Sequence, residues 1–221
     1  MRSRNVPKAE NKIQVIKYLD VGEMTITGSG KVSDDAFYTA REIILTITAK
    51  CPEILDKLSG YEFILVAPGE SLTAALGWKK RNKSKSRGIA LIQQESLGFP
   101  GRFAAHIERK KKPSMATFVH EFGHAIHYVI SQMDPEFNPS LNRAYNQAMK
   151  RGLWADKYFT PDNWKLQYSA VDEYWAEGVR MWYYLGKNHE FKTRDAFKKY
   201  DPELTNLLGL WLSEEDIPHG Y

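Results

Sequence analysis

The sequence predicts an α+β fold, in which a small mixed β-sheet packs on one long helix and a mainly helical part follows. Two observations favour this class. Strand-like apolar runs bounded by glycine and proline occur in the first half, whereas helical periodicity dominates after residue 113. Of the 221 residues, 43% are apolar and 13% aromatic, which is enough for one core. We therefore expect a single domain, with residues 1–112 as a mixed upper lobe and residues 113–221 as a helical lobe.

Three strands are expected before the long helix, which follows residue 113. They share β-branched and aromatic residues between turn signals, and they are KIQVIKYL at 12–19, YEFILVA at 61–67 and RGIALIQ at about 87–93. A short TIT segment lies between Gly22 and Gly30. The segment 95–103 contains two glycines and a proline, so we expect an irregular loop there.

Helices are expected wherever apolar residues recur at helical spacing between start and stop signals. Ser33 precedes a helix with Asp34 and Asp35 in its first turn, where negative charge suits the helix dipole, and Pro52 ends it. After the long helix, a further helix is expected from about Pro139 to Gly152. This order of elements agrees with the α+β class.

Composition excludes several classes of protein. No run is long and apolar enough for a membrane span, and MRSRNVPKAENKIQ at the N-terminus lacks the apolar core of a signal peptide. This fits either a cytoplasmic protein or the mature form of a secreted one. The single cysteine excludes an internal disulfide. Oligomeric state is not readable from the sequence.

The net charge of +4 is unevenly distributed. KKRNKSKSR at 79–87 and RKKK at 109–112 hold ten of the 31 basic residues and no acid, so 21 basic residues face 27 acidic ones in the remaining chain. Such runs are usually solvated loops, although they can also bind an anionic partner. Only Trp78 stands beside them as an aromatic residue, which argues against nucleic-acid binding.

The most informative stretch is HEFGHAIH at 120–127, inside the apolar run MATFVHEFGHAIHYVI. Because four residues return to one face of a helix, His120 and His124 can present two imidazoles to one metal ion. Glu121 projects from the edge of that face, where its carboxylate could reach a water on the metal without being a ligand. This is the HExxH arrangement of zinc hydrolases. The alternative is a buried helix whose histidines are merely hydrogen-bonded.

A second stretch supplies a third ligand. YSAVDEYWAEGVRMWYYLG at 168–186 reads as a helix from about Val171, with Glu173 and Glu177 one turn apart among aromatic residues. A catalytic zinc needs three protein ligands and an open position, so we assign Glu173 as the third ligand. Glu177 can accept a hydrogen bond from the far nitrogen of a ligating histidine. A solvated acidic edge is the alternative interpretation of the pair.

Other residues are rival candidates for the third ligand. His127 lies on the same rigid helix as His120 and His124 and cannot easily complete a tetrahedron with them, so we place it next to the ligands rather than on the metal. The remaining candidates are expected in loops or polar segments, and they are His106, Glu108, His189 and His219.

These two motifs together resemble a known family. HEFGHAIH, followed about 50 residues later by a tyrosine and EYWAE, is similar to the pattern of zincin metallopeptidases. The resemblance is closest to the glutamate-ligand group, the gluzincins, and within it to the anthrax lethal factor catalytic domain and the Pro-Pro endopeptidases. It covers roughly residues 88–186, and only the two motifs are specific.

The resemblance implies a zincin-like fold with one zinc ion held by His120, His124 and Glu173. It also implies that Glu121 is the general base and that Tyr168 donates a hydrogen bond to the oxyanion. In such enzymes an edge strand before the HExxH helix pairs with an extended substrate, and RGIALIQ is the candidate.

The match departs from the family at two positions. In those relatives the tyrosine lies seven residues before the glutamate, whereas Tyr168 lies five residues before Glu173, so Tyr158 is kept as the alternative. His127 stands where the relatives tend to have an aspartate. The metzincin pattern would require a histidine at position 130, and Ile130 excludes it.

The sequence therefore predicts a zinc metalloendopeptidase that hydrolyses peptide bonds of a peptide or protein with a zinc-activated water. The second hypothesis is a catalytically silent binding module with a zincin fold, which would dock an anionic partner through the basic segments 79–87 and 109–112.

Overall fold

The computed structural model describes residues 17–72, 88–91, 102–106, 115–155, 157, 170–185 and 190–218, and the fold is mixed α+β, as expected. Within this part of the chain, five strands form one sheet in the order β1-β2-β3-β5-β4. The strands are β1 (Lys17–Val21), β2 (Met24–Gly28), β3 (Glu62–Val66), β4 (Gly88–Leu91) and β5 (Arg102–His106).

The sheet combines parallel and antiparallel pairs. β1 and β2 form an antiparallel hairpin whose turn contains Gly22 at φ +59, a conformation that favours glycine. β2, β3 and β5 run parallel, and β4 runs antiparallel to β5 at the edge of the sheet. The three expected strands correspond to β1, β3 and β4, although residues 12–16 lie outside the described residues. The TIT segment is the centre of β2.

One expectation about this region was wrong. The predicted loop 95–103 ends in a strand, because β5 begins at Arg102 and continues to His106. His106 is therefore a strand residue that pairs with Val66, not a loop residue. Alanine-rich RFAAH has little strand preference of its own, and pairing with β3 on one side and β4 on the other holds it in the sheet.

The helices are α1 (Asp34–Thr48), α2 (Glu53–Lys57), α4 (Ala116–Met133), α5 (Phe137–Lys150), α6 (Ala170–Tyr183), α7 (Arg194–Tyr200) and α8 (Pro202–Trp211). The start of α1 after Ser33 is confirmed. α5 begins two residues before the expected Pro139. The helix tolerates Pro139 in its first turn, because the backbone N–H that proline lacks would have no partner within the helix at that position. α2, α7 and α8 were not predicted individually.

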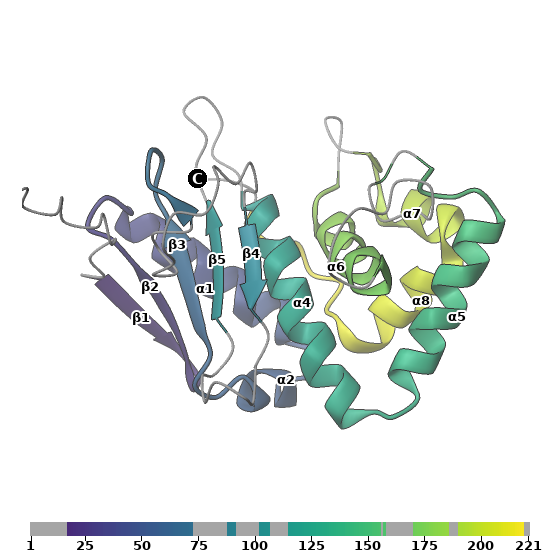
Figure 1. Cartoon of the computed structure of the whole chain (residues 1–221), viewed down its shortest axis with the longest axis horizontal. Coiled ribbons are helices and arrows are strands. Elements are labelled where there is room, and N and C mark those ends of the chain that lie inside the picture. The colour runs from purple at the N-terminus through teal and green to yellow at the C-terminus, as the bar shows by residue number, and fades with distance from the viewer. Residues whose placement is uncertain are drawn as a thin grey trace, which may run out of the picture.

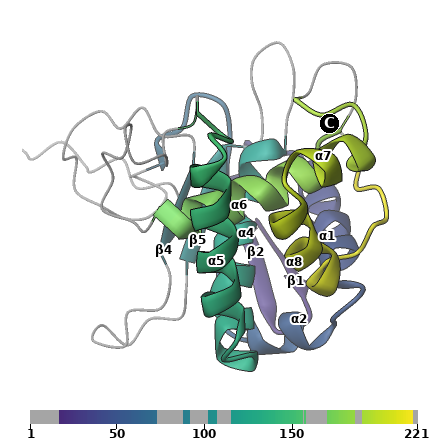
Figure 2. The same cartoon turned by 90° about the vertical axis from the view of Figure 1, so that its right-hand side faces the viewer.

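α4 is the element that joins the sheet to the helical part (Figure 1). One side of α4 packs on β4 and β5, and the other packs on α6. The ring of Phe118 lies 4.2 Å from that of Phe63 in β3, which ties α4 to the sheet. Seen from the helical side, α5, α7 and α8 lie in front of the sheet and α6 crosses behind α5 (Figure 2). The motif helices α4 and α6 are thus packed together in the interior.

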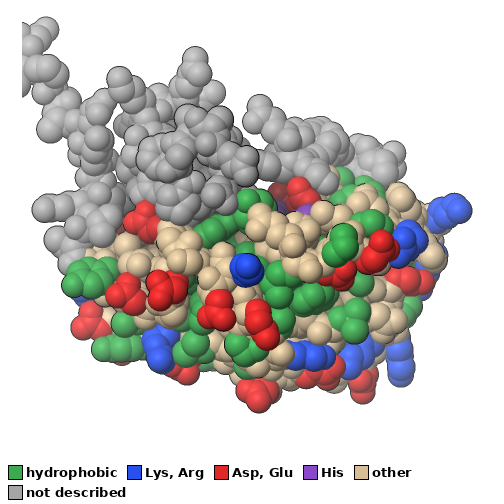
Figure 3. Space-filling model, turned by 90° about the horizontal axis from the view of Figure 1, so that it is seen from below, with side chains coloured by type: hydrophobic (Ala, Val, Ile, Leu, Met, Phe, Trp, Pro, Cys, Tyr) green, Lys and Arg blue, Asp and Glu red, His purple; other side chains and the backbone are tan. Residues whose placement is uncertain are grey.

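Seen from below, the described surface carries interspersed acidic, basic and apolar side chains (Figure 3). Within the described ranges, no helix is long and apolar enough to cross a membrane.

Candidate metal centre

His120 and His124 face the same direction from α4, as their four-residue spacing predicts. Their ring centroids lie 5.1 Å apart, with the rings almost perpendicular. The apolar residues between and around them are buried against the sheet and α6. His124 is only 7% exposed, so its imidazole lies in the protein interior rather than in solvent.

Glu173 reaches the two histidines from α6. Its Oε2 lies 3.3 Å from Nε2 of His120, and its Oε1 lies 3.7 Å from Nε2 of His124. One ligand atom from each of the three side chains lies within 4.8 Å of the other two. Within the described part of the chain, this is the one cluster of three or more histidine, cysteine or acidic residues with such geometry. The cluster could hold a metal ion.

A close contact between α4 and α6 makes this meeting possible. Gly123 lies inside the HExxH motif, and a Cβ built on it would stand 3.0 Å from the Cα of Ala176. The indole Nε1 of Trp175 donates a hydrogen bond of 3.1 Å to the carbonyl oxygen of Gly123. The absence of a side chain at Gly123 therefore lets the backbones of the two helices approach closely.

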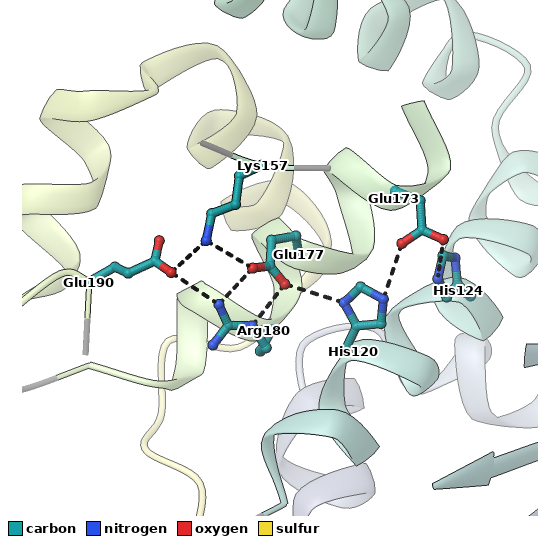
Figure 4. A network of polar contacts seen from close by, with 7 residues as sticks. All are labelled: His120, His124, Lys157, Glu173, Glu177, Arg180 and Glu190. Atoms are coloured by element: carbon teal, nitrogen blue, oxygen red, sulfur yellow. Dashed lines mark hydrogen bonds and ion pairs between the residues drawn. The ribbon is translucent and has the colours of Figure 1, made fainter. Parts of the chain in front are cut away.

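Glu177 lies on the other side of His120, one turn after Glu173. Its Oε2 is 3.4 Å from Nδ1 of His120, so the carboxylate faces the ring nitrogen turned away from Glu173 (Figure 4). This is the position that the spacing of the two glutamates predicts. The imidazole of His120 is thus held between two carboxylates, which fixes the orientation of its ring.

The two histidines differ in charge in the metal-free protein. Burial alone would lower the pKa of His120, but hydrogen bonds to Glu173 and Glu177 outweigh burial and raise that pKa to about 10. Burial and the positive charge of His120 lower the pKa of His124 to about 4. At neutral pH the metal-free site therefore holds one imidazolium and one neutral imidazole. A metal ion would replace the proton on Nε2 of His120.

Glu121 is buried, with 7% of its surface exposed. Burial raises the pKa of its carboxyl to about 7; the positive charge of His120 opposes this shift and the negative charge of Glu173 adds to it. A carboxyl group that titrates near neutral pH can both accept and return a proton.

His127 lies next to this cluster but does not join it. Its Nδ1 is 3.1 Å from Oδ1 of Asp172, and its Nε2 is 2.9 Å from Oδ1 of Asn138. His127 thereby connects α4 with α5 and with the residue before Glu173. Its predicted role in supporting the ligands from outside stays a prediction.

Several predicted residues lie outside the described residues. They are Tyr168, its alternative Tyr158, the rival ligands Glu108, His189 and His219, and the basic segments 79–87 and 109–112. The side chain of His106 is likewise not described, although its backbone is.

Sequence reasoning missed the charged residues grouped around Glu177, namely Arg180, Lys157 and Glu190. Arg180 follows Glu177 by three residues on α6, a spacing at which oppositely charged side chains meet, so a signal was present. Lys157 and Glu190 reach the same group from distant segments, and no local pattern indicated them. Gly123 was read only as part of the motif, although the approach of α6 depends on it.

Searches of protein-family models, of curated proteins and of solved structures found no match to this chain.

Proposed function

We propose that this protein is a zinc-dependent metalloendopeptidase with a zincin-like fold, which holds one zinc ion with His120, His124 and Glu173. The observation that carries the proposal is the meeting of two sequence motifs about 50 residues apart at one buried point. Chance matches to the HExxH pattern have no reason to place a glutamate from another helix beside both histidines.

The donor set suits zinc. Two imidazoles and one carboxylate are ligands of catalytic zinc sites, which leave a fourth position open. Zinc bonds of about 2.0–2.1 Å in a tetrahedron place neighbouring ligand atoms about 3.3 Å apart. Oε2 of Glu173 lies 3.3 Å from His120 and Oε1 lies 3.7 Å from His124, and one ligand atom from each of the three side chains lies within 4.8 Å of the others. To bind one zinc ion, the three side chains would close in to the separations of that tetrahedron.

Bound zinc would polarise the scissile carbonyl and lower the pKa of a water molecule to about 7. The remaining chemistry falls to residues of the chain. Glu121 would take the proton of the attacking water and return it to the leaving amine, which its raised pKa favours. Burial of the site would exclude bulk water and strengthen each of these interactions. The oxyanion role of Tyr168 rests on the family resemblance alone.

The proposal is tested by cleavage of peptide libraries with and without a zinc chelator. We expect cleavage that the chelator abolishes and added zinc restores. Glu121→Gln should retain the metal and lose activity by about 10²–10⁴-fold, the usual contribution of a general base. Normal cleavage by that variant would remove Glu121 from the mechanism.

Tyr168→Phe provides a separate test of the oxyanion assignment. We expect a lower turnover number with little change in zinc content, because a lost hydrogen bond to developing charge acts on the transition state. An unchanged turnover number would transfer the role to Tyr158, tested by Tyr158→Phe. Salt-sensitive binding to an anionic partner without chelator-sensitive cleavage would favour the binding-module hypothesis.

A further inference from the structure

We propose that Arg180 is a positioning residue of the metal centre: its guanidinium fixes the carboxylate of Glu177 against Nδ1 of His120 and thereby strengthens zinc binding. This inference rests on the proposed function. It assigns a role to an ion-pair group behind the site, formed by Glu177, Arg180, Lys157 and Glu190 (Figure 4).

The geometry between Arg180 and Glu177 is bidentate. Nε of Arg180 donates to Oε2 of Glu177 at 2.8 Å, and Nη2 donates to Oε1 at 2.7 Å. Two parallel hydrogen bonds from one planar group fix the plane of the carboxylate as well as its position. Glu177 therefore has a single orientation, and in that orientation Oε2 lies 3.4 Å from Nδ1 of His120.

This orientation determines which nitrogen of His120 is free for a metal. A carboxylate whose two oxygens already accept hydrogen bonds from a guanidinium has no hydrogen to donate. It can only accept a hydrogen bond from His120, so it favours a ring with hydrogen on Nδ1. Nε2, which faces Glu173 at 3.3 Å, is then the nitrogen that gives up its proton to a metal. In this scheme Arg180 acts on His120 through Glu177.

Two further residues hold this pair in place. Lys157 lies 3.4 Å from Oε1 of Glu177 and 2.5 Å from Oε1 of Glu190, and Arg180 lies 3.6 Å from the same oxygen of Glu190. The group therefore contains two carboxylates and two cations. Because the charges balance within the group, Glu177 is compensated by its own cations whether or not a metal is present. The side chain of Glu177 is 9% exposed and that of Arg180 22%, so solvent screens the pair only weakly.

The test measures the zinc dissociation constant of the full chain by competition with a chromogenic chelator. Four proteins form a cycle, namely the native chain, Arg180→Gln, Glu177→Gln and the double variant. Each single variant should bind zinc about 10–100-fold more weakly, the usual cost of losing a group that orients a ligating histidine. The double variant should bind no more weakly than Glu177→Gln, because Arg180 acts only through Glu177.

A matched control is available on the surface. Arg151, the residue that follows α5, pairs with Glu203 of α8 at 3.0 Å, and 42% of the Arg151 side chain is exposed. Arg151→Gln should leave the dissociation constant within about twofold of native, since exposed pairs contribute little. The inference is wrong if Arg180→Gln binds zinc as tightly as Arg151→Gln. It is also wrong if Arg180→Gln weakens zinc binding by the same factor in the native chain and in the Glu177→Gln background.

Arg180→Lys keeps the test decisive if Arg180→Gln fails to fold. Lysine retains the charge but cannot form two parallel hydrogen bonds, so we expect partial loss of affinity, between the native and Gln values. Native affinity in the lysine variant would contradict the need for the planar fork. The two proposals fail differently. A native chain that binds no zinc refutes the proposed function, whereas a zinc-binding native chain with an indifferent Arg180 refutes only the positioning role.

Discussion

Gly123→Ala should disturb the metal centre without touching any ligand. The added Cβ would stand 3.0 Å from Cα of Ala176, 3.3 Å from Cβ of Val179 and 3.4 Å from Cβ of Ala176. The nearest of these atoms belongs to the backbone of α6, so a change of side-chain rotamer cannot remove the contact. α4 and α6 must move apart instead.

The size of the movement follows from the contact distances. Carbon atoms pack best at about 3.5–4.0 Å, and a contact of 3.0 Å requires the backbone of α6 to give way by a few tenths of an ångström. A metal site tolerates deviations of only about 0.2 Å in its ligand distances. Because Glu173 is on one helix and both histidines are on the other, we expect zinc affinity to fall by about tenfold or more. The free energy of unfolding should fall by about 0–2 kcal/mol, since overpacking costs about 1–3 kcal/mol and replacing a helical glycine returns about 1 kcal/mol.

Two other helical glycines provide controls. At Gly209 in α8 the nearest atom to a new Cβ is 3.7 Å away, an ordinary contact, so Gly209→Ala should keep native zinc affinity and stability or gain up to about 1 kcal/mol. At Gly178 the new Cβ would meet Cδ2 of Leu204 at 2.7 Å, a side chain that can move, and the loss should be one of stability. Zinc affinity is measured by chelator competition and stability by denaturant unfolding. Native zinc affinity in Gly123→Ala would refute the view that this approach positions the ligands.

Two further predictions concern charge and the buried hydrogen bonds. In the metal-free protein, the ¹⁵N chemical shifts of His120 should remain those of an imidazolium up to about pH 9, because its pKa is raised to about 10. The stability that the charged ring contributes is fully present below about pH 6.5 and is lost as the pH rises through 10. A neutral His120 ring at pH 7.5 would contradict the view that two carboxylates hold the charged ring. Asp201 accepts hydrogen bonds from Nε1 of Trp154 and the hydroxyl of Tyr174, both at 2.7 Å, and from the backbone N–H of Leu204 at 3.2 Å. Asp201→Ala should therefore lower the free energy of unfolding by about 2–5 kcal/mol in denaturant experiments and leave zinc stoichiometry unchanged, whereas a loss below about 1 kcal/mol would mean that water replaces the carboxylate.

The candidate site could be predicted largely from the sequence because its geometry is local. Histidines four residues apart must share a face of any helix, and the same spacing rule places Glu177 one turn from Glu173. The structure places His120 and His124 on one face of α4, and Glu173 of α6 meets them there. That Glu173 would meet the two histidines was inferred from chemistry instead, because a catalytic zinc requires a third protein ligand.

Features that depend on distant contacts were not predicted. β5 has weak strand preference and exists because two neighbours pair with it. Lys157 reaches Glu177 from a distant segment, and Glu190 reaches Lys157 and Arg180 from another, and nothing near either residue indicates that meeting. The role of Gly123 depends on what lies opposite, which a single sequence does not reveal.

The central claim is tested most directly by counting zinc per chain in the native protein and in Glu173→Ala, each after exposure to zinc and removal of the excess. We predict about one zinc per native chain. The variant should lose most of it, because two histidines on one helix are a weak site without the carboxylate that lies beside both. A native protein without bound zinc would contradict the proposed function. Zinc fully retained by the variant would contradict Glu173 as the third ligand.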